Sequence, residues 1–140
     1  GSPNLSQLVG RFHDHLRNDD ELPFVDIVLL RAGCGDQTLA DFGGNACKGL
    51  VVAGFGGGTM PDNLNRLVAE TANLGCTVVV SSRVSQVTVL AETMTSVKSK
   101  NVFPSALLNP QKSALLLSLA LDANLDALEL AELFNVFVPQ

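Results

Sequence analysis

The residues best suited to chemistry in this sequence begin with a glycine-rich stretch, Gly54–Pro61, which follows a short apolar run. Glycines such as Gly57 and Gly58 let the backbone adopt positive φ angles and let another surface approach closely, and Thr59 adds a hydroxyl. The stretch lacks the Lys-Ser/Thr ending of a Walker loop, and Thr59 stands where a dinucleotide fingerprint has its third glycine. We therefore expect a binding loop rather than a nucleotide phosphate loop.

A second polar stretch, Ser81-Ser82-Arg83, follows another apolar run. Its two hydroxyls and its guanidinium could bind an anion, or Arg83 could pair with a nearby acid or with carbonyl groups and hold the loop. Ligands of open parallel α/β sheets bind beyond the carboxyl ends of the strands. We expect both stretches at that edge.

A catalytic set within the chain is not evident. A nucleophile needs a base within hydrogen-bond reach, and the only histidines, His13 and His15, lie in a predicted N-terminal helix. The acids Asp62, Glu70 and Glu92 form no obvious pair. The sequence therefore predicts no catalytic residue of its own.

Composition excludes several classes of protein. Hydrophobic residues make up 46% of the 140 residues and charged residues 16%, which excludes a disordered chain. The net charge of -5 argues against nucleic-acid binding, and no apolar run is long enough to cross a membrane. The cysteines Cys34, Cys47 and Cys76 lack the spacing of a disulfide framework or a metal site. We expect reduced thiols, no metal and no cofactor.

The elements that must position the polar stretches alternate between strands and helices. Apolar runs at 25–30, 50–53 and 77–80 are typical of parallel strands that are buried on both faces. Predicted helices lie at 4–17, 36–42 and 61–74, and a short edge strand lies at 102–103. A buried helix begins at Asn109-Pro110. A last helix begins at Asp122 or Asn124 and has Leu125, Leu128, Ala131 and Phe134 on one face. The stretch 81–100 receives no assignment.

Four blocks resemble a known family in their order and spacing. They are Leu22–Val28, Lys48–Gly58, Val79–Val84 and Leu108–Lys112. Over residues 22–135 the chain resembles the C-terminal domain of the L-asparaginase/glutaminase family. The resemblance implies an α/β fold, namely a flavodoxin-like, three-layer αβα domain with a short parallel sheet of about four strands.

The resemblance also implies a parent enzyme with two α/β domains. In this family the N-terminal domain carries the nucleophilic Thr and a Thr-Asp-Lys base system, which hydrolyse the side-chain amide of asparagine through an acyl-enzyme. The C-terminal domain builds much of the dimer and completes the neighbouring subunit's site with the loop after its second strand. The implied partners are the N-terminal catalytic domain, a second copy and a small amino-acid substrate.

Carried over onto this sequence, the resemblance assigns substrate contacts in trans and interface roles. The substrate contacts fall on Gly57, Gly58 and Thr59, and the interface or structural roles on Ser81, Ser82, Arg83 and Glu92. The family usually has Asn where this chain has Gly57, so the amide that would help to hold the substrate's amino group is missing. The hydroxyl of Thr59 is a shorter substitute.

These observations lead to one main hypothesis and two alternatives. In the main hypothesis, residues 22–140 are the C-terminal domain of a cytoplasmic asparaginase-type amidohydrolase, inactive alone, and residues 1–21 are a cloning remnant and a linker helix. The alternatives are a non-catalytic binding or interaction module with the same fold, and a subunit of an asparaginase-like amidotransferase. An apolar face that normally meets other domains predicts self-association at high concentration.

Overall fold

The computed structural model describes residues 5–18, 21–30, 48–84, 86–94 and 101–139. Its elements, in chain order, are α1 (Leu5–Asn18), β1 (Val25–Leu29), β2 (Gly49–Gly54), α3 (Asp62–Asn73), β3 (Thr77–Ser82), β4 (Val102–Pro104), α4 (Pro110–Asp122) and α5 (Ala127–Asn135). The helix predicted at 36–42 lies outside the described residues, as do Cys34 and Cys47.

The strands form a four-stranded sheet in the order β1-β2-β3-β4, and every neighbouring pair is parallel. In the register, Val51 of β2 lies opposite Ile27 on one side and Val79 on the other. All of β2 is buried, as expected for an apolar strand with neighbours on both sides and helices on both faces. The predicted parallel sheet is confirmed.

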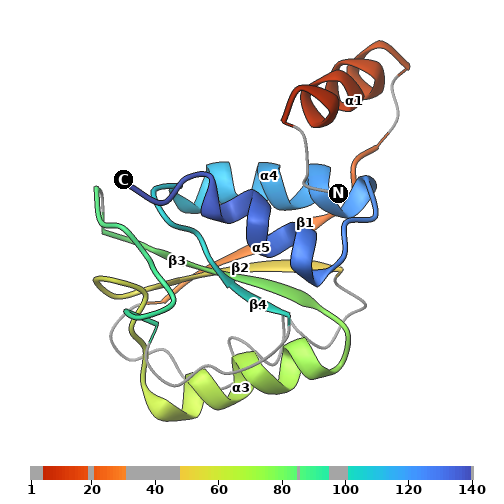
Figure 1. Cartoon of the computed structure of the whole chain (residues 1–140). Coiled ribbons are helices and arrows are strands. Elements are labelled where there is room, and N and C mark those ends of the chain that lie inside the picture. Colours follow the sequence, from red (N-terminus) through yellow and green to blue (C-terminus); the bar gives the residue numbers. More distant parts are fainter. Residues whose placement is uncertain (1–4, 19–20, 31–47, 85, 95–100, 140) are drawn as a thin grey trace.

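Helices cover both faces of this sheet, with α3 on one face and α4 and α5 on the other (Figure 1). Side chains alternate along the strands, so Leu50 and Val52 pack in the cluster that contains α3. Val51 and Val79 pack in the opposite cluster with α4 and α5. The three-layer αβα fold is therefore confirmed. Helix α1 lies outside these layers and contacts α4.

The beginning of the last helix differs from the prediction. Helix α4 continues to Asp122, and the chain then turns through Asn124, whose φ is 56°. Asp126 is the N-cap of α5, because its side chain accepts from Glu129 N while the Glu129 side chain accepts from Asp126 N. The prediction of a start at Asp122 or Asn124 is wrong, because Asp122 still belongs to α4 and Asn124 lies in the turn that precedes the N-cap Asp126.

This shift also changes the buried face of α5. The buried residues are Leu130, Leu133 and Phe134, whereas Leu128 is 77% exposed. Leu128 and Ala131, which the sequence pattern groups with Phe134 on one face, therefore lie outside the buried face of α5. Within the described residues, no helix is both long and apolar enough to cross a membrane.

Candidate functional site

The glycine-rich stretch forms a tight turn at the carboxyl end of β2. Phe55 and Thr59 pair across it, with Phe55 N donating to Thr59 O at 2.8 Å and Thr59 N donating to Phe55 O at 2.8 Å. Gly56 and Gly58 have φ angles of 45° and 94°, values that residues with a Cβ rarely adopt. We call residues 54–60 the glycine turn.

The hydroxyl of Thr59 is oriented by the turn itself. Its Oγ1 donates to the carbonyl oxygen of Phe55 at 3.0 Å, and the residue is exposed. Because the hydroxyl hydrogen is used in this bond, the oxygen is left to act as an acceptor toward solvent. The glycine turn thus presents a fixed acceptor that a donor group, such as an ammonium, could use.

A second loop packs against the glycine turn through Thr93. Thr93 Oγ1 donates to the carbonyl oxygen of Gly57 at 2.6 Å and accepts from Leu90 N at 3.0 Å. A Cβ added at Gly57 would lie 2.9 Å from the Cβ of Thr93, which is closer than real Cβ atoms come. The contact with Thr93 therefore explains why position 57 has no room for a side chain. Nothing in the sequence alone indicated this role for Thr93.

The serine–serine–arginine stretch begins inside the sheet, because Ser81 and Ser82 are the last residues of β3 and are buried. The expectation that they lie in the loop after the strand is wrong, since the register pairs Ser81 with Ala53 and Ser82 with Gly54. Ser81 Oγ donates to Leu108 O at 3.2 Å. Its hydroxyl thus joins the end of β3 to the segment before α4.

Arg83 links three strand ends at the same edge. Its Nη1 donates to Leu30 O at 2.8 Å, and its backbone N donates to Gly54 O at 3.0 Å. The guanidinium carbon also lies 5.8 Å from the centre of the Phe55 ring, which fits a cation–π contact. Arg83 therefore bonds to carbonyl groups and packs on Phe55 of the glycine turn.

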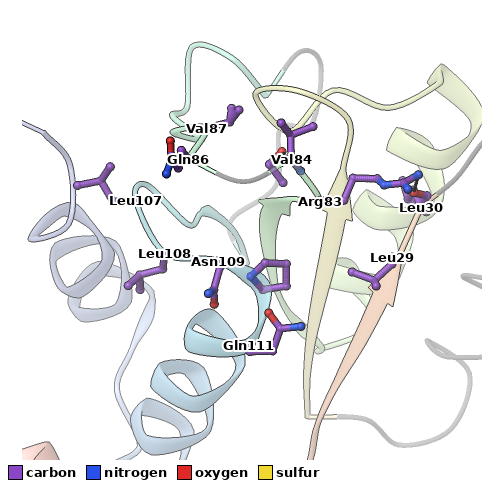
Figure 2. Close-up of a pocket in the computed structure, with 12 residues that line it drawn as sticks. Leu29, Leu30, Arg83, Val84, Gln86, Val87, Leu107, Leu108, Asn109 and Gln111 are labelled. Atoms are coloured by element: carbon purple, nitrogen blue, oxygen red, sulfur yellow. Dashed lines mark hydrogen bonds between the residues drawn. The ribbon is translucent and has the colours of Figure 1, made fainter.

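A pocket of about 420 Å³ opens at this edge of the sheet (Figure 2). Arg83 and Leu29 line it on the strand side, and Asn109 and Gln111 line it on the α4 side. Asn109 is the N-cap of α4 and accepts from Lys112 N at 2.8 Å. The Asn109-Pro110 pair marked this helix start in the sequence, but only the fold shows that it faces Arg83.

The remaining polar candidates lie apart from one another. Glu92 is exposed in the turn that carries Thr93, and His13 is exposed on α1. Cys76 is buried. In the parts of the chain that the structure describes, no group of three or more His, Cys, Asp or Glu residues could hold a metal ion.

Comparison with known proteins agrees with this geometry. The family model of the glutaminase/asparaginase C-terminal domain matches residues 24–134. L-asparaginase 2 of Escherichia coli (strain K12) is 33% identical over 121 residues, covering 84% of this chain and 34% of that protein. L-asparaginase 2 of Bacillus subtilis (strain 168) is 32% identical over 120 residues, covering 86% of this chain and 32% of that protein.

A solved structure, described as a probable cytoplasmic L-asparaginase from Campylobacter jejuni, superposes with a TM-score of 0.70. It is 33% identical, and the match covers 83% of this chain and 36% of that one. The chain thus spans about a third of the length of the proteins that it matches. The family match over most of the sequence, together with the parallel sheet and its helices, shows that the chain belongs to the glutaminase/asparaginase C-terminal domain family.

Proposed function

We propose that residues 22–140 are the C-terminal domain of a longer asparaginase-type amidohydrolase, which hydrolyses the side-chain amide of asparagine to aspartate and ammonia. The catalytic threonines belong to an N-terminal domain, and residues 1–21 are a cloning remnant and a linker helix. Support comes from the family match and from relatives about three times as long. The name of the Campylobacter jejuni relative supports a cytoplasmic parent.

In this proposal the glycine turn contributes to a neighbouring subunit's site. The observation that carries it is the exposed Thr59 hydroxyl, whose hydrogen is committed to Phe55 O. The remaining lone pairs suit the ammonium group of an amino-acid substrate. Gly57 and Gly58 let the turn pack tightly against Thr93 and Val89, and this packing holds Thr59 in place.

The other assigned residues have supporting roles. Ser81 and Ser82 hold the end of β3, and Arg83 holds the ends of β1 and β2 through Leu30 O and Gly54 O. These bonds fix the edge that meets the partner subunit of a homo-oligomer. Glu92 is exposed beside Thr93 and forms part of the same interface.

Ammonia release tests the proposal at two levels. The purified 140-residue chain should release no more ammonia from asparagine than its Thr59→Ala variant, because both lack the nucleophile. In the longer protein, Thr59→Ala should raise KM for asparagine more than it lowers kcat, because it removes a ground-state contact. Thr59→Ser keeps the acceptor and is the matched control. Ammonia released by the isolated chain above its Thr59→Ala control would overturn the proposal.

One observation favours a second candidate, a binding module without catalysis. Thr93 occupies the space that an amide side chain at Gly57 would need, so the turn offers fewer substrate contacts. Calorimetry with asparagine, aspartate, glutamine and nucleotides separates the two functions. Binding of a nucleotide without binding of any amino acid would favour the module.

A further inference from the structure

The pocket beside Arg83 adjoins the glycine turn, because Arg83 contacts Gly54 and Phe55, but none of its described lining residues belongs to residues 54–60 or 89–94. It lies between the carboxyl ends of β1 and β3 and the N-terminus of α4 (Figure 2). Its aliphatic lining residues are Leu29, Leu30, Val84, Val87, Leu107 and Leu108. Leu29, Val84 and Leu107 are 53%, 49% and 57% exposed, so the walls offer apolar surface to a ligand.

The electrostatics of the pocket favour an anion. Among the described residues that line it, Arg83 alone is charged, although the whole chain carries a net charge of -5. One bond to Leu30 O and the Phe55 ring position the guanidinium, which has five N–H donors in all. Helix α4 adds the partial positive charge of its N-terminus and has no acidic residue in its first turn to offset it.

The polar side chains around this charge can donate hydrogen bonds. Gln86 and Gln111 line the pocket, and both carry an amide NH2 group. The side-chain oxygen of Asn109 is already used, because it accepts from Lys112 N. The lining therefore combines a cation and amide donors with branched aliphatic side chains.

We propose that this pocket binds a small monocarboxylate with a branched aliphatic body. The carboxylate lies against Arg83 and the N-terminus of α4, and the aliphatic body packs against Leu29, Leu107 and Leu108. The described lining residues all belong to this chain, so the site can be tested in the isolated domain. A volume of about 420 Å³ lies within the range of small-molecule sites.

Three probes with one carbon skeleton test the anion preference. Isotope-labelled chain is titrated by NMR with 4-methylpentanoate, 4-methylpentanamide and 4-methylpentylamine. The carboxylate should shift the backbone amide signals of Arg83, Val84 and Gln111 in a saturable way, and the amide should bind about tenfold more weakly or worse. Equal affinity for the amide, or saturable shifts confined to other regions, would overturn the proposal.

Variants test whether the charge acts at this pocket. Arg83→Gln should weaken 4-methylpentanoate binding about tenfold or more, and Arg83→Lys should retain part of it. Lys112→Gln is the matched control, because Lys112 lies in the same turn of α4 but outside the lining, and it should change affinity less than twofold.

Because Arg83 also holds Leu30 O, a second variant leaves it in place. Gln111→Glu adds a negative charge to the lining at an exposed position and favours the start of α4, so the fold is retained. It should abolish the saturable shifts, whereas Asn135→Asp, outside the lining, should leave them unchanged. Unaltered binding in Gln111→Glu would refute the site.

Discussion

The hydroxyl oxygen of Thr93 lies 2.6 Å from the carbonyl oxygen of Gly57 and joins two loops whose contacting residues are 36 positions apart in sequence. The same side chain occupies the space into which a side chain at Gly57 would extend. Loop 89–94 is itself held to the sheet edge, because Val89 and Ala106 exchange backbone hydrogen bonds of 3.0 and 2.8 Å. Thr93 therefore holds the glycine turn at a fixed position relative to the sheet edge.

Removing the Thr93 hydroxyl should loosen the glycine turn. Thr93→Val keeps the shape of the side chain but loses the bonds to Gly57 O and Leu90 N, so we expect a loss of about 1–2 kcal/mol in the free energy of unfolding. Amide hydrogen exchange of Gly58 and Thr59 should accelerate more than that of α5. Thr93→Ser keeps the hydroxyl and should exchange like the wild type. Identical exchange in the two variants would contradict this role.

The steric relation between the two residues predicts coupled effects. Gly57→Asn alone should destabilise the chain by about 1–3 kcal/mol, because its Cβ would lie 2.9 Å from the Cβ of Thr93. Thr93→Gly removes the obstructing atoms, so Gly57→Asn should cost less in that background. Urea unfolding followed by circular dichroism measures the double-mutant cycle, since the chain has no Trp or Tyr. Additive effects would show that the contact does not limit position 57.

The sheet and most helices could be predicted because their signals are local. The buried strand β2 is apolar on both faces, and Asn109-Pro110 supplies both the N-cap and the first residue of α4. The structure confirms a helix within the predicted range 61–74, and its buried residues Leu64 and Val68 are one helical turn apart. Such features depend on residues that are neighbours in sequence.

The candidate site could be predicted only in outline. The glycine turn and Arg83 were located from residue type and from their positions after apolar runs. Their partners could not be, because Thr93, Leu30 O and Leu108 O reach them only through the register of the sheet and the path of the loops. Backbone carbonyls also carry no sequence signal, since every residue has one.

Among the described side chains of α1, Leu8 is the buried one, and we expect it to contribute more to the docking of this helix than the Arg11–Asp122 ion pair. Leu8 is 4% exposed and packs in the cluster with α4 and α5. Leu8→Ala should therefore weaken the docking of α1 on the rest of the domain by about 2–3 kcal/mol. Arg11 bonds to the Asp122 carboxylate at 2.8 Å, but its side chain is 50% exposed. Its coupling with Asp122 should be no more than about 1 kcal/mol and should fall as salt is added.

Amide hydrogen exchange along α1 measures both effects. Leu8→Ala should increase exchange across α1 while β2 stays protected, because the sheet keeps its other layers. Val9→Ala is the control, since Val9 lies on the same helix but is 49% exposed. A larger effect from Arg11→Ala than from Leu8→Ala would show that the ion pair, and not apolar packing, holds the helix.

Two buried serines near the sheet edge should respond to the same substitution with opposite signs. Ser81 and Ser105 are both 0% exposed, and Ser81 Oγ donates to Leu108 O at 3.2 Å. Among the described residues, Ser105 Oγ has no hydrogen-bond partner, although its backbone N donates to Val80 O at 2.9 Å.

Ser105→Ala keeps that backbone bond and removes a buried unsatisfied hydroxyl, so it should raise the free energy of unfolding by about 1 kcal/mol. Ser81→Ala should lower it by about 1 kcal/mol, because Leu108 O loses a donor. Urea unfolding of both variants decides the matter, and a loss of stability in Ser105→Ala equal to that in Ser81→Ala would show that the Ser105 hydroxyl is satisfied.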